Sequence, residues 1–386
     1  MTDAGGLIEW SELMTLGARE LEENRVRDAR GSFGKAAELG RQMGQGDLLS
    51  FSLRMLGLTQ NRLGNYTEAR LAFSESLELA RKAGNLRGQA EALSGLANVA
   101  FSLEEIQIAE DLFIEACELF TQLGDEIRKA MILCDLGALQ CNASRWEKAA
   151  AAYSEALKLC RTYDEKHGEA EILVMLGELS RRQGNLEESA VHLMGASLVF
   201  AALKDLRSLA STLQYLGLTY HDMGELQKAA DNHRRALALW NELGEKEEIA
   251  LVQFALGKLS QALGQLEEAE TYFINSLELV KDNPDAAGYR QQNLGSLFLM
   301  RKDLVRAEQN FNAALKSFQH WGKLEKAGEI LEILGFLREI EGDSKQAEEY
   351  YLKALEAFDT SGSKKGQGEV YRLSLIHISE PTRQAE

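Results

Sequence analysis

Small and apolar side chains return along this chain with a step of forty residues. Within one step, leucines recur at intervals of three and seven residues, as at Leu53, Leu56 and Leu63, which is the spacing of one helix face. The pair Gly64-Asn65 then breaks the helix, and a second apolar stripe begins. Each step is therefore predicted to form a helical hairpin.

The most regular positions of the step hold the smallest side chains. They are Gly17, Gly57, Ala97, Gly137, Gly177, Gly217, Gly257, Gly295 and Gly335. A glycine inside a helix costs about 1 kcal/mol relative to alanine, so its repetition predicts a close helix–helix contact. Sixteen residues later come the residues predicted to fill the hairpin core: Phe33, Phe73, Phe113, Tyr153, Leu193, His233, Phe273, Phe311 and Tyr351. A fixed period of this length indicates a solenoid.

The phased Leu-Gly, the Ala after the inner turn, the aromatic residue and the second Ala resemble the tetratricopeptide repeat. The resemblance covers residues 9–360 as nine units, and it implies an all-α fold, a right-handed α-α superhelix (solenoid) of helical hairpins. The long unit resembles the subgroup of Leu-Gly-Asn repeat modulators of G-protein signalling, bacterial peptide-sensing regulators and sensor arms of bacterial transcription activators. The Asn after Leu-Gly that typifies the first of these groups is nearly absent here.

The ends of the chain and one shortened step break this regularity. Residues 1–8 are expected to be an N-terminal tail, and residues 361–372 the start of a tenth hairpin. Residues 373–386 include LSLIHISEPTR, which resembles a translated sequencing adapter, so we expect them to be foreign and the tenth hairpin to be cut. The step from Gly257 to Gly295 is thirty-eight residues and contains Pro284, which predicts a local change of superhelix pitch.

Composition narrows the classes of partner. The net charge of −17 argues against nucleic acid as the main ligand, because phosphate binding needs a basic surface. The four cysteines lack the spacing of a disulfide framework, which indicates a reducing compartment. The N-terminus does not resemble a signal peptide, and no apolar stretch approaches the roughly 20 residues of a membrane span. We therefore expect a cytoplasmic protein without membrane insertion.

The predicted working surface is the concave wall, which the first helix of each hairpin forms in this family. A stripe on that helix, beside the core positions, predicts a groove for a protein or peptide partner that carries acidic groups, because Arg binds carboxylates bidentately and Asn pairs with peptide backbone. The alternative for each position is an ordinary solvated helix residue. The groove residues are Arg54, Leu58, Asn61, Arg62, Asn98, Phe101, Asn142, Arg181, Arg182, Gln214, His221, Phe254 and Lys258, and Glu332 and Glu339 make the far end acidic.

Other chemistry is poorly supported by the sequence. Cys134 and Cys141 lie two helical turns apart, too far for a disulfide, which leaves a redox-sensing thiol as an alternative and predicts no metal site. Phosphate-loop, HExxH and GxSxG motifs do not occur, so we expect no cofactor and no catalysis. The first interpretation is a non-catalytic interaction scaffold. The second is a ligand- or peptide-sensing module of a larger regulator, and the weakest is an enzyme that uses the repeats as an active-site wall.

Overall fold

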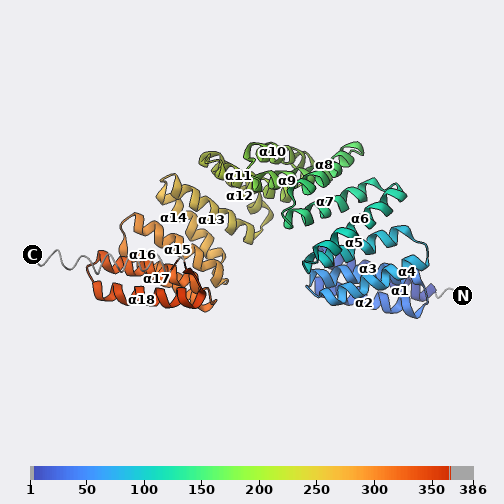
Figure 1. Ribbon diagram of the computed structural model, residues 1–386, viewed down its shortest axis with the longest axis horizontal. Coiled ribbons are helices and arrows are strands. Elements are labelled where there is room, and N and C mark those ends of the chain that lie inside the picture. The colour runs from blue at the N-terminus through green and yellow to red at the C-terminus, as the bar shows by residue number, and fades with distance from the viewer. Residues whose placement is uncertain (1–3, 365, 367–386) are drawn as a thin grey trace, which may run out of the picture. The chain divides into compact units, whose positions relative to one another are not determined.

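Every secondary-structure element that the computed structural model describes is an α-helix. The description covers residues 4–364 and 366, and within them lie eighteen helices and no strand (Figure 1). The chain separates into two compact units, Met1–Val199 (unit 1) and Phe200–Glu386 (unit 2), and the boundary falls inside α10. The expected all-α solenoid of helical hairpins is confirmed.

The helices have nearly constant length. Unit 1 contains α1 (Ala4–Glu22), α2 (Val26–Gln42), α3 (Gly46–Arg62), α4 (Tyr66–Lys82), α5 (Leu86–Ser102), α6 (Ile106–Leu123), α7 (Glu126–Asn142), α8 (Trp146–Thr162) and α9 (Lys166–Arg182), and α10 (Leu186–Leu203) crosses the boundary. Unit 2 continues with α11 (Leu206–Asp222), α12 (Leu226–Leu243), α13 (Lys246–Ala262), α14 (Leu266–Leu279), α15 (Pro284–Met300), α16 (Leu304–His320), α17 (Leu324–Ile340) and α18 (Ser344–Ser361).

Each hairpin contacts its neighbours in sequence. In unit 1, α3 packs on α4 and α4 packs on α5, and in unit 2 the same order joins α15, α16 and α17. First helices of consecutive hairpins also contact each other: α3 contacts α5, α5 contacts α7, α7 contacts α9, and α13 contacts α15. In unit 1, α3, α5, α7 and α9 therefore lie side by side, and in unit 2 α13 lies beside α15, which is the arrangement that the predicted groove requires.

The phased glycines make the contact that the sequence predicts. A Cβ on Gly57 would lie 2.9 Å from the Phe73 ring, and one on Gly137 would lie 2.4 Å from the Tyr153 ring. Atoms cannot approach this closely, so the aromatic residue packs against the bare backbone of the first helix. The same contact recurs at Gly17, Gly177, Gly217, Gly257, Gly295 and Gly335, each time with the residue sixteen positions later.

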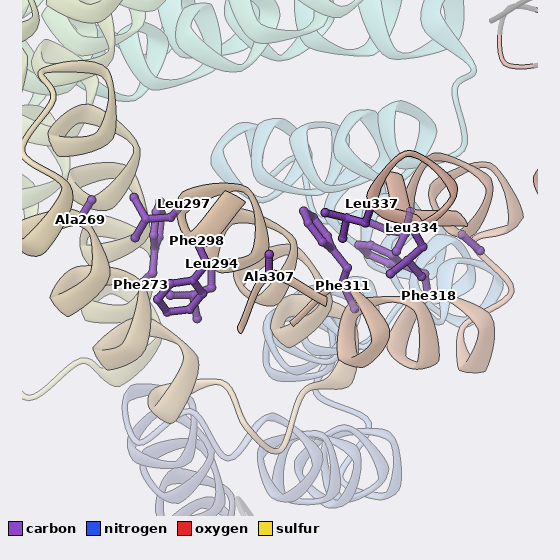
Figure 2. Close-up of a cluster of buried hydrophobic side chains, with 13 residues drawn as sticks. Ala269, Phe273, Leu294, Leu297, Phe298, Ala307, Phe311, Phe318, Leu334 and Leu337 are labelled. Atoms are coloured by element: carbon purple, nitrogen blue, oxygen red, sulfur yellow. The ribbon is translucent and has the colours of Figure 1, made fainter. Parts of the chain in front are cut away.

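These contacts merge into a core that continues from one hairpin to the next. Figure 2 shows this for unit 2, where Phe273 of α14, Leu297 of α15, Phe311 of α16 and Leu337 of α17 belong to one buried cluster. Phe273 and Phe311 are 0% exposed. The aromatic stripe is therefore structural, as the sequence predicts.

Left-handed residues end many of the helices. Gly124 has φ of 65° and donates to the Phe120 and Thr121 carbonyls at the end of α6, a conformation that glycine adopts without steric cost. Where the step lacks a turn glycine, another residue takes the same conformation: Asn24, Glu104, Ser144, Asp164, Lys204 and Lys302. The shortened step is absorbed by α14, which has 14 residues, and Asn283 caps α15 by accepting from the Ala286 N–H.

The N-terminal boundary differs from the expected one, and most of the C-terminal end lies outside the described residues. Helix α1 begins at Ala4, so residues 4–8 of the expected tail belong to the first helix, in which Gly6 is buried. The tenth hairpin lies, apart from residues 362–364 and 366, outside the described residues, and so does the adapter-like segment 373–386.

Helix α10 corrects the expectation that no apolar stretch approaches the length of a membrane span. Among the described residues it is the one helix with suitable length and composition, with 18 residues, a mean hydropathy of 1.3 and 28% of its residues buried. A core helix passes the same test of length and composition, and Leu193, Ala196 and Phe200 on the inner side of α10 are exposed by 2% or less. Length and composition alone therefore do not make α10 a membrane segment.

Candidate peptide-binding surface

The predicted groove residues all lie on first helices, but they divide between the two units. Unit 1 holds Arg54, Leu58, Asn61 and Arg62 on α3, Asn98 and Phe101 on α5, Asn142 on α7, and Arg181 and Arg182 on α9. Unit 2 holds Gln214 and His221 on α11, and Phe254 and Lys258 on α13. Each unit therefore presents its own stretch of the stripe.

Arg54 is engaged inside the protein. Its guanidinium lies 2.9 Å from a Glu91 carboxylate oxygen and 5.1 Å from the centre of the Phe51 ring, and its side chain is 12% exposed. Burial lowers the pKa of Arg54, although Glu91 opposes this effect. The other Glu91 oxygen accepts from Arg128 at 2.6 Å, so one carboxylate links α3, α5 and α7.

Arg181 and Arg182 share a single carboxylate. They lie 3.0 Å and 3.1 Å from the two Glu178 oxygens on the same helix. Burial tends to raise the pKa of Glu178, but hydrogen bonds from the two arginines outweigh it and hold this pKa below its ordinary value. Arg182 keeps 48% of its side chain exposed and Arg181 keeps 25%, so Arg182 is the more accessible cation.

The two buried or partly buried amides of unit 1, Asn98 and Asn61, differ in their hydrogen bonding. Asn98 hydrogen-bonds to Asp135 of α7, and burial raises the pKa of this carboxyl to about 6. The Asn61 side-chain oxygen is buried and has no hydrogen-bond partner among the described residues. Arg62 and Asn142 are exposed, and Leu58 is 36% exposed. The accessible part of the stripe in unit 1 is therefore made by Leu58, Arg62, Asn142 and Arg182.

In unit 2 the predicted residues are largely engaged. Gln214 accepts from the indole N–H of the buried Trp240 at 2.7 Å and donates to Glu248 at 3.3 Å. His221 Nδ1 lies 3.5 Å from an Asp222 carboxylate oxygen. Gln214 therefore joins α11 to α12 and α13, whereas His221 pairs with its neighbour on the same helix and keeps 51% of its side chain exposed.

An aromatic and cationic cluster forms around Phe254. Its ring centre lies 4.5 Å from the Arg290 guanidinium, 5.8 Å from the centre of the Phe273 ring and 5.9 Å from the Lys258 ammonium nitrogen. Arg290 is 5% exposed, donates to Ser276 Oγ and the Ala286 carbonyl, and has its pKa lowered by burial.

Sequence reasoning missed Glu91, Asp135 and Arg290. The sequence spacing could have predicted the pairing of Glu91 with its arginines, because Arg–Glu ion pairs recur between residues about one step apart. Examples are Arg41–Glu75 and Arg81–Glu115, both thirty-four residues apart, and Arg145–Glu110, thirty-five apart. At the phases of Asp135 and Arg290 most units hold apolar or small residues, which makes each of the two a departure from the repeat.

The surroundings of the four cysteines disfavour the thiolate, because burial raises the pKa of each thiol. Burial raises the pKa of Cys134 to about 12, and Cys117 responds in the same way. Since the thiolate is the nucleophile, these groups stay protonated and slow to react at neutral pH. Within the described part of the chain, no three His, Cys, Asp or Glu side chains gather in a group that could hold a metal ion.

A hollow of about 640 Å³ lies between α8, α9 and α10, away from the predicted stripe. Its walls include Ser154 and Lys158 of α8, Leu176 and Ser180 of α9, and His192 of α10. None of the thirteen groove residues lines it.

Family models identify the repeat. The tetratricopeptide-repeat model matches residues 88–162, 168–242 and 208–282, and the model for anaphase-promoting complex subunit 5 matches residues 32–100. No curated protein matches this sequence.

Solved structures share the fold at low identity. The apo form of RapI is 14% identical, with a TM-score of 0.65 over 92% of this chain and 99% of that chain. A signal-transduction ATPase with a tetratricopeptide-repeat sensor from Pyrococcus horikoshii is 14% identical, with a TM-score of 0.66 over 93% of this chain and 55% of that one. A Rap protein complexed with competence and sporulation factor is 15% identical, with a TM-score of 0.52 over 91% and 98%.

Proposed function

This chain belongs to the tetratricopeptide-repeat family, and from that premise we propose that it is a non-catalytic scaffold that binds an acidic peptide or partner segment along its first helices. Its role is protein interaction, as the repeat and its structural neighbours indicate. The observation that carries the finer proposal is the side-by-side contact of α3, α5, α7 and α9. That contact aligns the accessible cations and amides of successive hairpins.

The ion pairs rank the arginines as peptide contacts. A ligand carboxylate must compete with Glu91 for Arg54, and with Glu178 for Arg181 and Arg182. Arg62 and Arg182 are the more exposed pair, so they contribute more to affinity than the buried Arg54. Leu58 supplies apolar contact beside them, and the partly buried Phe101, which packs against the core of unit 1, adds less, so the ligand gains from many modest contacts.

The experiment compares charge reversals on two faces. Arg62→Glu with Arg182→Glu changes the groove, and Arg41→Glu with Arg81→Glu makes the same change of net charge on second helices α2 and α4. The probe is a fluorescent peptide library rich in Asp and Glu, with an Asn/Gln library as its neutral counterpart, read by fluorescence anisotropy.

Loss of acidic-peptide binding in the first variant alone is the expected result. Equal binding by both variants, or equal binding of acidic and neutral peptides, removes the groove proposal. Reversal of all four of Arg54, Arg62, Arg181 and Arg182 gives the strongest version of the test, and unchanged affinity there has the same meaning.

The alternative function is a sensing module of a larger cytoplasmic regulator. The match to 55% of the Pyrococcus horikoshii protein favours it, because that protein carries its tetratricopeptide repeats as a sensor. The reading frame in the source genome tests this alternative. An output domain after the repeats supports it, and a stop codon directly after a tenth hairpin counts against it.

A further inference from the structure

The outer face of α10 is unlike that of every other second helix. Fourteen, seventeen, twenty-one and twenty-four residues after the phased Gly177 come Val191, Met194, Leu198 and Ala201. At the third of these positions the other eight units hold Glu38, Glu78, Glu118, Lys158, Ala238, Glu278, Lys316 and Glu356. Only α10 therefore carries an apolar side chain larger than Ala at a position where charge is the rule.

These four residues form an exposed apolar seam. Val191 is 62% exposed, Met194 40% and Leu198 72%, and Ala201 is also exposed. Their spacing of three, four and three residues is that of a heptad seam, which packs against another helix. From Ser189 to Leu203 the helix has no Asp, Glu, Lys or Arg, so the seam has no charge to keep it in water.

The charges at the two ends of α10 indicate which kind of partner helix packs on the seam. Glu187 and Glu188 stand exposed in its first turn, and the exposed Lys204 directly follows its last residue. A second copy of the same helix, running antiparallel, brings Lys204 opposite Glu188. The same two-fold axis sets Val191 opposite Ala201 and Met194 opposite Leu198, so that large and small side chains alternate.

We propose that α10 is a self-association surface, through which two copies of this chain pair as antiparallel helices about a two-fold axis. Such an isologous contact closes on itself and does not build filaments. Stable dimers bury about 1,200 Å² or more, and one pair of helices provides less, so the dimer is weak and reversible, with a Kd in the micromolar range or above. The rest of the acidic surface, at a net charge of −17, also opposes tight pairing.

Sedimentation equilibrium of the full chain over a wide concentration range tests the pairing. The wild type is expected to show a monomer–dimer equilibrium, and Leu198→Glu is expected to raise the Kd at least about tenfold. This substitution introduces the residue that five other second helices hold at this position, so the hairpin is expected to fold. Leu71→Glu on α4, where Leu71 is 66% exposed, is the matched control and leaves the Kd unchanged. A wild type that stays monomeric, or a dimer indifferent to Leu198→Glu, overturns the proposal.

Two further variants test the antiparallel order. Lys204→Glu is expected to weaken the dimer, and adding Glu188→Lys restores it, because the pair is exchanged across the axis. Val191→Cys combined with Ala201→Cys is expected to give inter-chain disulfides that join position 191 to position 201, as peptide mapping by mass spectrometry reports. A dimer that cross-links position 191 to position 191 instead contradicts this order.

The other possible occupants give distinct results. A monomeric wild type that floats with phosphatidylcholine vesicles, and loses this with Leu198→Glu, assigns the seam to a membrane surface and overturns self-association. The seam lies on a second helix, and the proposed groove lies on first helices, so Leu198→Glu is expected to leave peptide binding intact. Failure of one proposal therefore leaves the other standing.

Discussion

At the scale of single residues, the repeat depends on where a side chain is missing. Two glycines inside helices, Gly137 and Gly31, differ in what surrounds them. Gly137 faces the Tyr153 ring, where a Cβ would lie at 2.4 Å, whereas a Cβ on Gly31, inside α2, would meet nothing within 4 Å. The first glycine is required by packing, and the second only weakens its helix.

Alanine at the two sites is expected to move stability in opposite directions. Gly137→Ala forces the Tyr153 ring or α7 to shift and is expected to destabilise by about 1–3 kcal/mol, the usual cost of overpacking. Gly31→Ala removes backbone freedom from the unfolded chain and is expected to stabilise by up to about 1 kcal/mol. Urea unfolding followed by far-ultraviolet circular dichroism measures both. A neutral Gly137→Ala contradicts the close contact.

His233 links the same core contact to pH. It occupies the phase that is aromatic or aliphatic elsewhere, is 3% exposed, and its Nδ1 has no hydrogen-bond partner among the described residues. Burial lowers the pKa of His233 to about 4, and the nearby His221 acts in the same direction. A proton therefore binds the unfolded chain, with its ordinary pKa near 6.5, more readily than the folded one.

The direction in which stability changes with pH follows from this difference in pKa. The stability that neutral His233 contributes is complete above pH 6.5 and declines as the pH falls from there toward 4. Between pH 7.5 and 5.5 we expect the wild type to lose about 1 kcal/mol through this group. His233→Phe introduces the aromatic residue that most other hairpins hold. Its free energy of unfolding is expected to fall by about 1 kcal/mol less than that of the wild type over the same pH range. Denaturant unfolding at several pH values measures this difference. If the free energy of unfolding changes equally with pH in the two proteins, His233 is not the group responsible.

At the scale of the helix and its turn, the backbone is more regular than the sequence. Every described turn between the helices of a hairpin has the same shape, but the left-handed position holds Gly64 in one hairpin and Ser144 in another. A non-glycine residue in this conformation carries a steric cost of about 1–2 kcal/mol. The turn therefore keeps its geometry because packing of the flanking helices offsets the strain.

Relief of that strain is measurable. Ser144 has φ of 55°, so Ser144→Gly is expected to stabilise the protein by about 1 kcal/mol. Its neighbour Ala143 has φ of −78°, where glycine offers no advantage, so Ala143→Gly is expected to be neutral or destabilising. The midpoints of thermal unfolding separate the two variants, and a lower midpoint for Ser144→Gly would contradict the argument.

The elements also show which parts of the structure a sequence can predict. The hairpins were predictable because the Gly–aromatic contact lies within one hairpin, at a fixed distance along the chain. The ion pairs of the candidate surface, such as Arg54–Glu91–Arg128, join three hairpins, and their geometry depends on rotamers that no local pattern encodes. The predicted residues lie on first helices, as the repeat period implies, while which of them are accessible emerged only from the structure.

At the scale of the whole molecule, a local defect in a solenoid destabilises only the helices that pack against the altered hairpin. Within each unit, the packed helices are those one or two apart in sequence, such as α15, α16 and α17. In such an array, stability is a sum of hairpin terms and nearest-neighbour interface terms. The position of a defect along the chain therefore decides how much of the molecule opens.

Hydrogen exchange of two variants tests this dependence on position. Gly335→Val presses on Tyr351 in the last described hairpin, and Gly137→Val presses on Tyr153 inside unit 1. The first is expected to lower amide protection in α17 and α18, partly in α16, and not in α3 to α6. The second has packed hairpins on both sides, so protection falls from α5 to α9 while α15 to α18 keep theirs. Because each hairpin contacts only its neighbours, the two protection maps should barely overlap, and equal loss along residues 4–364 in both variants would show one cooperative unit instead.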